Sequence, residues 1–315
     1  MSLTAEVTPA WSVKKVQAPE VWAKGNTGQN VVVGIIDSGV RGTHEALRGN
    51  FRGAYGWYDP EAQAANPYDS SGHGTHVAGS AVGGNGIGVA PGAKWMACKA
   101  CRTSECLESD MTACTQFMLC PTDTNGANKD CSKAPHVINN SWGSGYGGDN
   151  SNAAIVAAWR SAGIIPVFAS GNVNTACGTV TSPGDFPNVI SVGATNSDDS
   201  LLFYSGTGPT KTGLLKPDVT APGGVVYSAW SGSDTEYKND SGTSMASPHV
   251  AGAVALLLSA KPNLRFDQVR DALTATTDKN LKTTGRTCGG TVDQVFPNNI
   301  FGNGRINVLN AVTKQ

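Results

Sequence analysis

Charged side chains are scarce in this chain. Asp, Glu, Lys and Arg make up 15% of its 315 residues, whereas about 25% is usual. The net charge is only −1, which gives no reason to expect nucleic acid or an anionic membrane as a partner. The longest apolar stretches fall short of the ~20 residues that a membrane-spanning helix needs. No internal repeat, heptad or low-complexity tract is present.

An apolar leader is also missing from Met1 to Lys15, so we expect no signal peptide there. By contrast, glycine is abundant at 39 residues, and there are eight cysteines. Glycine suits tight turns and close packing of helices. The length suits one α/β domain over residues 1–315 with a large core.

The segment GTSMASPHVAG, Gly242 to Gly252, places a serine among small residues ahead of an apolar run that reaches Leu258. This pattern predicts a helix that is buried all round and begins near Ser244, with Pro248 in its first turn. A hydroxyl there is held rigidly near the positive end of the helix dipole, which suits a nucleophile. The alternative role for Ser244 is a helix N-cap.

A nucleophilic serine needs a base, a group that orients the base and an oxyanion donor. Val31 to Ile36 predict a buried parallel strand, which ends in Asp37. A glycine-flanked histidine, His73, opens a helix of small residues. Ile164 to Ala169 predict another strand, and Asn172 follows it with an amide suited to an oxyanion.

Each of these residues also has an ordinary structural interpretation. Asp37 suits a turn, His73 a loop and Asn172 an Asx turn. For His76, three residues along the same helix, we adopt the structural interpretation, a histidine satisfied by local hydrogen bonds. The order Asp, His, Asn, Ser, with each residue at a strand end or a helix start, favours a catalytic site over four unrelated structural roles.

The segments around Asp37, His73, Asn172 and Ser244 resemble the active-site blocks of the subtilisin family of serine proteases, and the order Asp, His, Ser matches that family. The resemblance runs from about Val31 to Leu258. Within the family, the stretches KWMACKA and HVINNSWG resemble the bacillopeptidase-F-like branch. The resemblance implies an α/β, three-layer subtilisin-like fold, with a mostly parallel central sheet and helices on both faces.

The resemblance also implies a mechanism. Ser244 attacks the peptide carbonyl, His73 takes and later returns its proton, and Asp37 orients the imidazole. Asn172 and the Ser244 backbone N–H bind the oxyanion. Met245 directly follows the nucleophile, so its oxidation to the sulfoxide is expected to slow the enzyme.

The substrate cleft follows from the same resemblance. Ser141, Trp142 and Gly143 are expected to pair with the substrate backbone as an added strand, which predicts broad cleavage. Trp142 is interpreted equally well as a core aromatic. The pocket for the residue before the scissile bond is expected to have Thr181 as its floor and a wall made of Ala169, Ser170 and Gly171.

The cysteines form a second signal. Their close spacing is compatible with zinc, but no histidine lies in the cluster and a secreted protease family favours disulfides. We therefore predict four bridges, one between Cys177 and Cys288 and three within the cluster, whose pairing cannot be deduced. We expect the segment from Cys101 to Leu107 to border the cleft. The cluster forms a cysteine-rich insertion over residues 98–131 and contains Cys98, Cys101, Cys106, Cys114, Cys120 and Cys131.

No cofactor is required by this interpretation, although the resemblance raises structural calcium or another cation. The loop Ala81 to Ala90 is short, and Ala46 stands where the family's strong calcium site has an aspartate, so we expect that site to be missing. The resemblance also implies a weaker cation site, which is expected to use Asp218 with the backbone carbonyls of Gly184, Phe186 and Val189. The alternative role for Asp218 is a local cap or bridge.

The resemblance further implies a mature, secreted, extracellular enzyme that is a monomer, acts on proteins and peptides, and is inhibited by its own propeptide. Of two glycosylation sequons, Asn239 is the better candidate, because Asn139 lies in a predicted buried strand. A non-catalytic binding protein usually shows a damaged site, and an α/β-hydrolase esterase needs Gly-x-Ser-x-Gly. A disulfide-rich binding module is shorter than this chain. A serine endopeptidase fits best.

Overall fold

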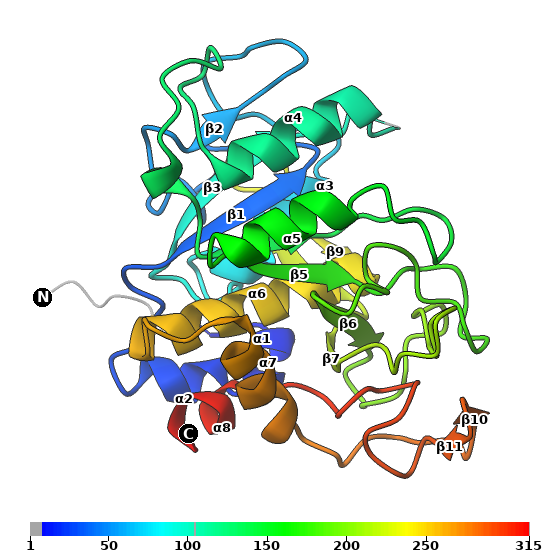
Figure 1. The fold of residues 1–315 in the computed structure, drawn as a ribbon. Helices are drawn as coiled ribbons and strands as arrows, with labels where there is room; N and C mark the ends of the chain where they lie inside the picture. The colour runs from blue at the N-terminus through cyan, green and yellow to red at the C-terminus, as the bar shows by residue number, and fades with distance from the viewer. Residues whose placement is uncertain (1–7, 104, 315) are drawn as a thin grey trace, which may run out of the picture.

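The computed structural model describes residues 8–103 and 105–314 and is centred on a parallel β-sheet (Figure 1). Seven strands lie in the order β2-β3-β1-β4-β5-β6-β7, and each neighbouring pair is parallel. The strands are β1 (Val32–Asp37), β2 (Trp57–Tyr58), β3 (Lys94–Lys99), β4 (Val137–Asn140), β5 (Ile165–Ala169), β6 (Ile190–Thr195) and β7 (Val219–Pro222).

Helices cover both faces of this sheet. One face carries α3 and α6, with α1, α2, α7 and α8 beside them, and the other carries α4 and α5 (Figure 1). This arrangement confirms the predicted three-layer fold. The helices are α1 (Trp11–Lys15), α2 (Ala18–Trp22), α3 (His73–Val82), α4 (Glu108–Leu119), α5 (Ala153–Ser161), α6 (Thr243–Ala260), α7 (Phe266–Ala275) and α8 (Val308–Thr313), with a 3-10 turn at Cys131–Lys133. Two antiparallel ribbons lie outside the sheet, β8 (Val226–Ala229) with β9 (Tyr237–Asp240) and β10 (Thr287–Cys288) with β11 (Thr291–Val292).

Both faces of the central strands are apolar, which explains their continuous apolar runs. Successive side chains of a strand point to opposite faces. In β1, Ile35 packs in the core beneath α3 and α6, whereas Ile36 packs beneath α4 and α5. In β3, Trp95 and Met96 divide in the same way.

Helix α6 is the buried helix that the sequence predicts at Ser244. By length and composition it is apolar enough to cross a membrane, but 83% of it is buried inside the protein, as in the core helix of a globular domain. The prediction for Pro248 is wrong in detail, because this residue lies in the second turn. A proline there leaves the Ser244 carbonyl without an intrahelical donor. The hydroxyl of Ser141 donates to that carbonyl at 2.8 Å, which makes the proline tolerable.

The carboxyl ends of the parallel strands meet at one edge of the sheet, where open α/β sheets place their binding sites. Asp37 closes β1, Ser141 follows β4, and Asn172 comes shortly after β5. Helices α3 and α6 both begin at this edge, with His73 and Thr243 as their first residues. Segments from five elements therefore converge there.

Candidate active site

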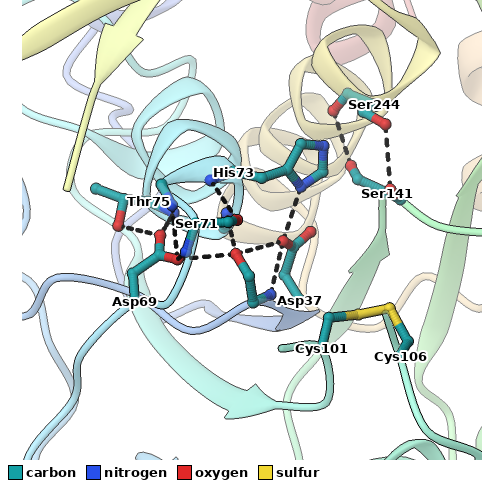
Figure 2. A network of polar contacts seen from close by, with 12 residues as sticks. Asp37, Asp69, Ser71, His73, Thr75, Cys101, Cys106, Ser141 and Ser244 are labelled. Carbon is teal, nitrogen blue, oxygen red and sulfur yellow. Dashed lines mark hydrogen bonds and ion pairs between the residues drawn. A yellow bond between two sulfur atoms is a disulfide. The ribbon is translucent and has the colours of Figure 1, made fainter. Parts of the chain in front are cut away.

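Asp37 and His73 form a close pair at the edge of the sheet (Figure 2). The Nδ1 atom of His73 lies 2.7 Å from Oδ1 of Asp37, whose residue is only 3% exposed. The Ser38 backbone N–H donates to the same carboxylate oxygen at 2.8 Å. Helix α3 approaches β1 this closely because Gly74 has no side chain: a Cβ there would lie 3.0 Å from the Asp37 Cβ and collide with backbone.

The surroundings of His73 favour its protonated form. Burial of the ring lowers its pKa, but the charge and hydrogen bond of Asp37 oppose this effect, and the charges of Asp240 and Asp69 add to them. The net result raises the pKa of His73 to about 9. An imidazole beside a buried carboxylate in this way is held in one tautomer, with its other nitrogen available to a reacting group.

Ser244 lies on the other side of the His73 ring, as the second residue of α6 (Figure 2). Gly242 occupies the N-cap position, so the capping alternative for Ser244 is wrong. The hydroxyl of Ser244 donates to the Ser141 carbonyl at 3.1 Å in this structure. Since catalytic hydrogen bonds are often formed only with substrate present, a rotation of this side chain toward His73 is the motion that the chemistry needs.

Asn172 is held with its amide N–H groups toward the same space. Its Oδ1 accepts the Thr243 backbone N–H at 2.9 Å and the Thr243 hydroxyl at 2.8 Å. The amide oxygen is therefore occupied, and Nδ2 is the end left to donate. A Cβ on Gly242 would lie 3.2 Å from that Nδ2 atom, so glycine keeps the space open.

A cleft of about 250 Å³ opens beside these residues. Thr181 lies between two glycines. A Cβ on Gly171 would lie 2.6 Å from the Thr181 hydroxyl oxygen, and a Cβ on Gly143 would lie 3.0 Å from it. This is the position expected of a pocket floor. Of the residues expected in the cleft, those that line it are Ser141, Trp142, Gly143, Ala169, Gly171 and Thr181, joined by Asn172 and Ser244.

Ser170 and Trp142 both make contacts outside the cleft. The side chain of Ser170 faces away from the cleft, since its buried hydroxyl donates to the Gly206 carbonyl at 3.1 Å, so a pocket wall at this position would be formed by its backbone. Side chains alternate along an extended segment, so Ala169 and Ser170 face opposite ways. Trp142 fits both of its interpretations, since it lines the cleft while its ring packs edge-on against Phe168 at 5.2 Å.

All eight cysteines are joined in pairs, so their thiolates are not zinc ligands. The Cys101–Cys106 hairpin borders the active site, since the backbone N–H of Cys101 donates to the Asp37 carbonyl at 3.1 Å (Figure 2). Residue 104, within that hairpin, lies outside the described residues. The bridges are Cys98–Cys114, Cys101–Cys106, Cys120–Cys131 and Cys177–Cys288.

The expected weak cation site does not fit a metal ion. The Nζ atom of Lys216 lies 2.7 Å from Oδ2 of Asp218 and donates to the Val189 carbonyl at 3.0 Å. Lys216 is only 3% exposed. Two of the four expected ligands, Asp218 and Val189, are thus already bound to an ammonium group. Among the described residues, no group of three or more His, Cys, Asp or Glu side chains is placed to hold a metal.

Two other histidines, His76 and His249, are buried against backbone carbonyls. His76 is fully buried, and its Nε2 lies 3.0 Å from the Val226 carbonyl. Burial lowers the pKa of His76 to about 4. His249 on α6 is also fully buried, with Nδ1 2.8 Å from the Met245 carbonyl, and burial lowers its pKa to about 4 as well.

Sequence reasoning missed Ser38, Asp69 and Lys216. Asp69 and Ser38 complete the network around the catalytic pair (Figure 2). The signal for Asp69 was its position four residues before His73, which is compatible with capping the start of a helix. Lys216 carried a signal too, two residues before Asp218, but only the structure brings its ammonium group to the carboxylate.

Comparison with known proteins places the chain in a family. A model of the subtilase family matches residues 28–304. Bacillopeptidase F of Bacillus subtilis is 37% identical over 96% of this chain and 22% of its own length. Subtilisin E of the same organism is 37% identical over 84% of this chain and 65% of its own length. Subtilisin Savinase of Lederbergia lenta is 33% identical over 94% of this chain and 96% of its own length.

The chain thus spans about a fifth of the length of bacillopeptidase F and 65% of that of subtilisin E. These similarities agree with the resemblance read from the motifs around Asp37, His73, Asn172 and Ser244. The match to the family model extends over most of the described structure. The chain therefore belongs to the subtilase family of serine endopeptidases.

Proposed function

We propose that this chain is a serine endopeptidase that hydrolyses peptide bonds with broad specificity. The observation that carries the proposal is the convergence of Asp37, His73, Ser244 and Asn172 at one edge of the sheet. Each belongs to a different segment of the chain, and each side chain has a geometry suited to one catalytic role.

In the proposed reaction, the Ser244 hydroxyl leaves the Ser141 carbonyl and gives its proton to Nε2 of His73 as its oxygen attacks the peptide carbonyl. The imidazolium is stabilised by Asp37 at 2.7 Å. The C–N bond then breaks, the leaving amine takes the proton from His73, and an ester on Ser244 remains. Water hydrolyses that ester with His73 as the base again.

Negative charge develops on the carbonyl oxygen during both steps. Asn172 Nδ2 and the Ser244 backbone N–H are the proposed donors to it. Thr243 holds the Asn172 amide oxygen from two sides, so the donor is oriented before substrate arrives. Such fixed donors stabilise the transition state without any rearrangement cost during the reaction.

Broad specificity is proposed from the cleft. The segment Ser141 to Gly143 offers backbone groups for pairing with an extended peptide, and backbone pairing does not depend on the substrate sequence. The pocket is walled by Gly143, Ala169 and Gly171, so it leaves room for a large apolar side chain above Thr181.

We propose in addition that the enzyme acts outside the cell as a monomer and is held inactive by its own propeptide until processing. Four disulfides support an oxidising compartment.

We also propose that Lys216 takes the place of a cation beside Asp218. The buried ammonium already neutralises the carboxylate and binds the Val189 carbonyl. A chelator such as EDTA is therefore expected to leave the melting temperature of the protein unchanged as far as this region is concerned. The Lys216→Met variant is expected to melt at a lower temperature. A large loss of melting temperature in EDTA that vanishes in Asp218→Asn would overturn this proposal.

The proposed activity is tested with casein and a panel of small esters, using the Ser244→Ala variant as the control. We expect casein to be cut at many sites and Ser244→Ala to be inactive while melting at nearly the same temperature. Hydrolysis of esters with no cleavage of casein or of peptides would indicate an esterase, and equal activity of the variant would exclude Ser244 as the nucleophile.

A further inference from the structure

The carboxylate of Asp69 accepts five hydrogen bonds at the start of α3 (Figure 2). Its Oδ1 accepts the Ser38 hydroxyl at 2.8 Å and the backbone N–H groups of Ser71 and Gly72, each at 2.9 Å. Its Oδ2 accepts the backbone N–H of Thr75 at 2.8 Å and the Thr75 hydroxyl at 2.6 Å. One side chain thus joins the residue after Asp37 to the helix that begins with His73.

This arrangement replaces an ordinary helix cap. Gly72 occupies the N-cap position with φ 95° and has no side chain to offer, although the first turn of a helix leaves its N–H groups without partners. Side chains from outside supply the acceptors: Ser71 Oγ for the His73 N–H at 3.2 Å, and Ser38 Oγ for the Gly74 N–H at 3.0 Å. Asp69 accepts the next N–H and also binds the Ser38 hydroxyl.

The Ser38 hydroxyl has one proton and two carboxylates within reach. Its oxygen lies 2.8 Å from Asp69 Oδ1 and 3.2 Å from Asp37 Oδ1. The nearer acceptor makes the better hydrogen bond, so the proton is directed to Asp69. Oδ1 of Asp37 is then left to the His73 ring and to the Ser38 backbone N–H.

Asp69 also contributes to the electrostatics of His73. The charged groups that act on this ring are Asp37, Asp240 and Asp69, which raise its pKa. Burial lowers the pKa of His73 and is the largest single effect. His76 acts in the other direction only when protonated, and burial keeps the pKa of His76 near 4.

We propose that Asp69 is a positioning residue for the catalytic pair, which fixes the first turn of α3 against the end of β1 and keeps the Ser38 proton away from Asp37. The proposal rests on the proposed peptidase function, because its readouts are kinetic. Asp69 acts through Ser38 and the helix start, and does not touch the reacting atoms.

The test is the nearly isosteric Asp69→Asn variant, whose amide nitrogen cannot accept the hydrogen bonds made at one carboxylate oxygen. We expect kcat to fall by roughly 10- to 100-fold, the effect of losing hydrogen bonds to a charged group, with KM little changed. We also expect the acid limb of the kcat/KM profile to move to lower pH. The sign follows because removing a negative charge lowers the pKa of His73, which must be neutral to act as base.

Asp123 provides a matched control. Its carboxylate accepts the backbone N–H groups of Asn125 and Ala127 at 3.0 and 2.9 Å and the Asn128 side chain at 2.8 Å, in a loop that makes no hydrogen bond to the catalytic residues. Asp123→Asn is expected to alter the melting temperature at most, with kcat and the pH profile unchanged. If Asp69→Asn behaves in the same way as Asp123→Asn, Asp69 is purely structural and the proposal is wrong.

The Ser38→Ala variant keeps the proposal testable if Asp69→Asn does not fold, since it leaves the bonds of Asp69 to Ser71, Gly72 and Thr75 in place. We expect it to lower kcat several-fold with a small change in melting temperature, and unchanged kcat would overturn the link through Ser38. Where both variants fold, the fall in kcat caused by Asp69→Asn is expected to be smaller in the Ser38→Ala background.

Activity of the unmodified chain and its loss in Ser244→Ala are measured first, so that failure of the peptidase function is recognised separately.

Discussion

Helix α3 holds two histidines one turn apart in opposite environments. His73, at the edge of the sheet, faces the Asp37 carboxylate, and its pKa is raised to about 9. His76, in the interface with α6 and the β8–β9 ribbon, faces backbone carbonyls, and burial lowers its pKa to about 4. The same side chain thus has its protonated form favoured in one place and its neutral form favoured in the other. The difference lies in which group each ring nitrogen meets.

The comparison predicts that replacing His73 lowers activity, whereas replacing His76 lowers stability. His73→Ala is expected to lower kcat by about 10⁶-fold while leaving the melting temperature within a few degrees. Assays with a chromogenic peptide, and a thermal melt of the same sample, measure both effects. A loss of less than about 100-fold would show that His73 is not the base.

Asn172 belongs to the catalytic edge and has no role in the core. Asn172→Ala is expected to lower kcat by roughly 10²- to 10³-fold, because one oxyanion donor is lost, with little change in KM. Asn174→Ala is the matched control, since Asn174 caps an exposed loop two residues further on through its bond to the Ala176 N–H. If both variants have the same kcat, the assignment of the oxyanion donor is incorrect.

His76→Ala is expected to show the reverse pattern. Removing the ring leaves the buried carbonyl of Val226 and the part-buried carbonyl of Lys238 without this donor, at a cost of about 1–3 kcal/mol of folding free energy for an unsatisfied buried group. Denaturant unfolding measures this loss, and the kcat of the folded fraction is expected to stay near that of the unmodified chain. A stable variant with low kcat would mean that His76 takes part in the chemistry.

The two environments also predict two separate pH profiles. Because the pKa of His73 is raised, the acid limb of kcat/KM is expected above the ordinary imidazole value of 6.5. Because the pKa values of His76 and His249 are lowered to about 4, the unfolded chain binds more protons between pH 6.5 and 4. Their contribution to stability is therefore present above pH 6.5 and lost as the pH falls toward 4. Coincident profiles would show that the two kinds of histidine do not titrate in different environments.

The positions of the four proposed catalytic residues at one edge of the sheet could be predicted from sequence because each lies within a short, dense motif. Asp37 follows an apolar run, and His73 and Ser244 open helices of small residues, so local pattern and location in the fold agree. The family resemblance then supplied the sheet and its layers, which the structure confirms. Thr181 lies beside Gly171 and Gly143 in the cleft, where the resemblance expects the pocket floor.

Features that depend on contacts between distant segments were not predictable. The pairing of Cys98 with Cys114 requires knowing how α4 packs on β3. The sequence did not reveal a role for Lys216, because its Nζ atom is brought to the Asp218 carboxylate only by the fold. Ser170 was expected in the pocket wall from the family resemblance, and only the structure shows that its side chain points to the opposite side.

The most direct test of the central claim is covalent labelling with a fluorophosphonate, followed by peptide mapping by mass spectrometry. We expect one label per chain, on Ser244, with loss of activity in proportion to labelling and no label in Ser244→Ala or in the protein after unfolding. Label on another residue, or full activity after complete labelling of Ser244, would contradict the assignment of Ser244 as the nucleophile.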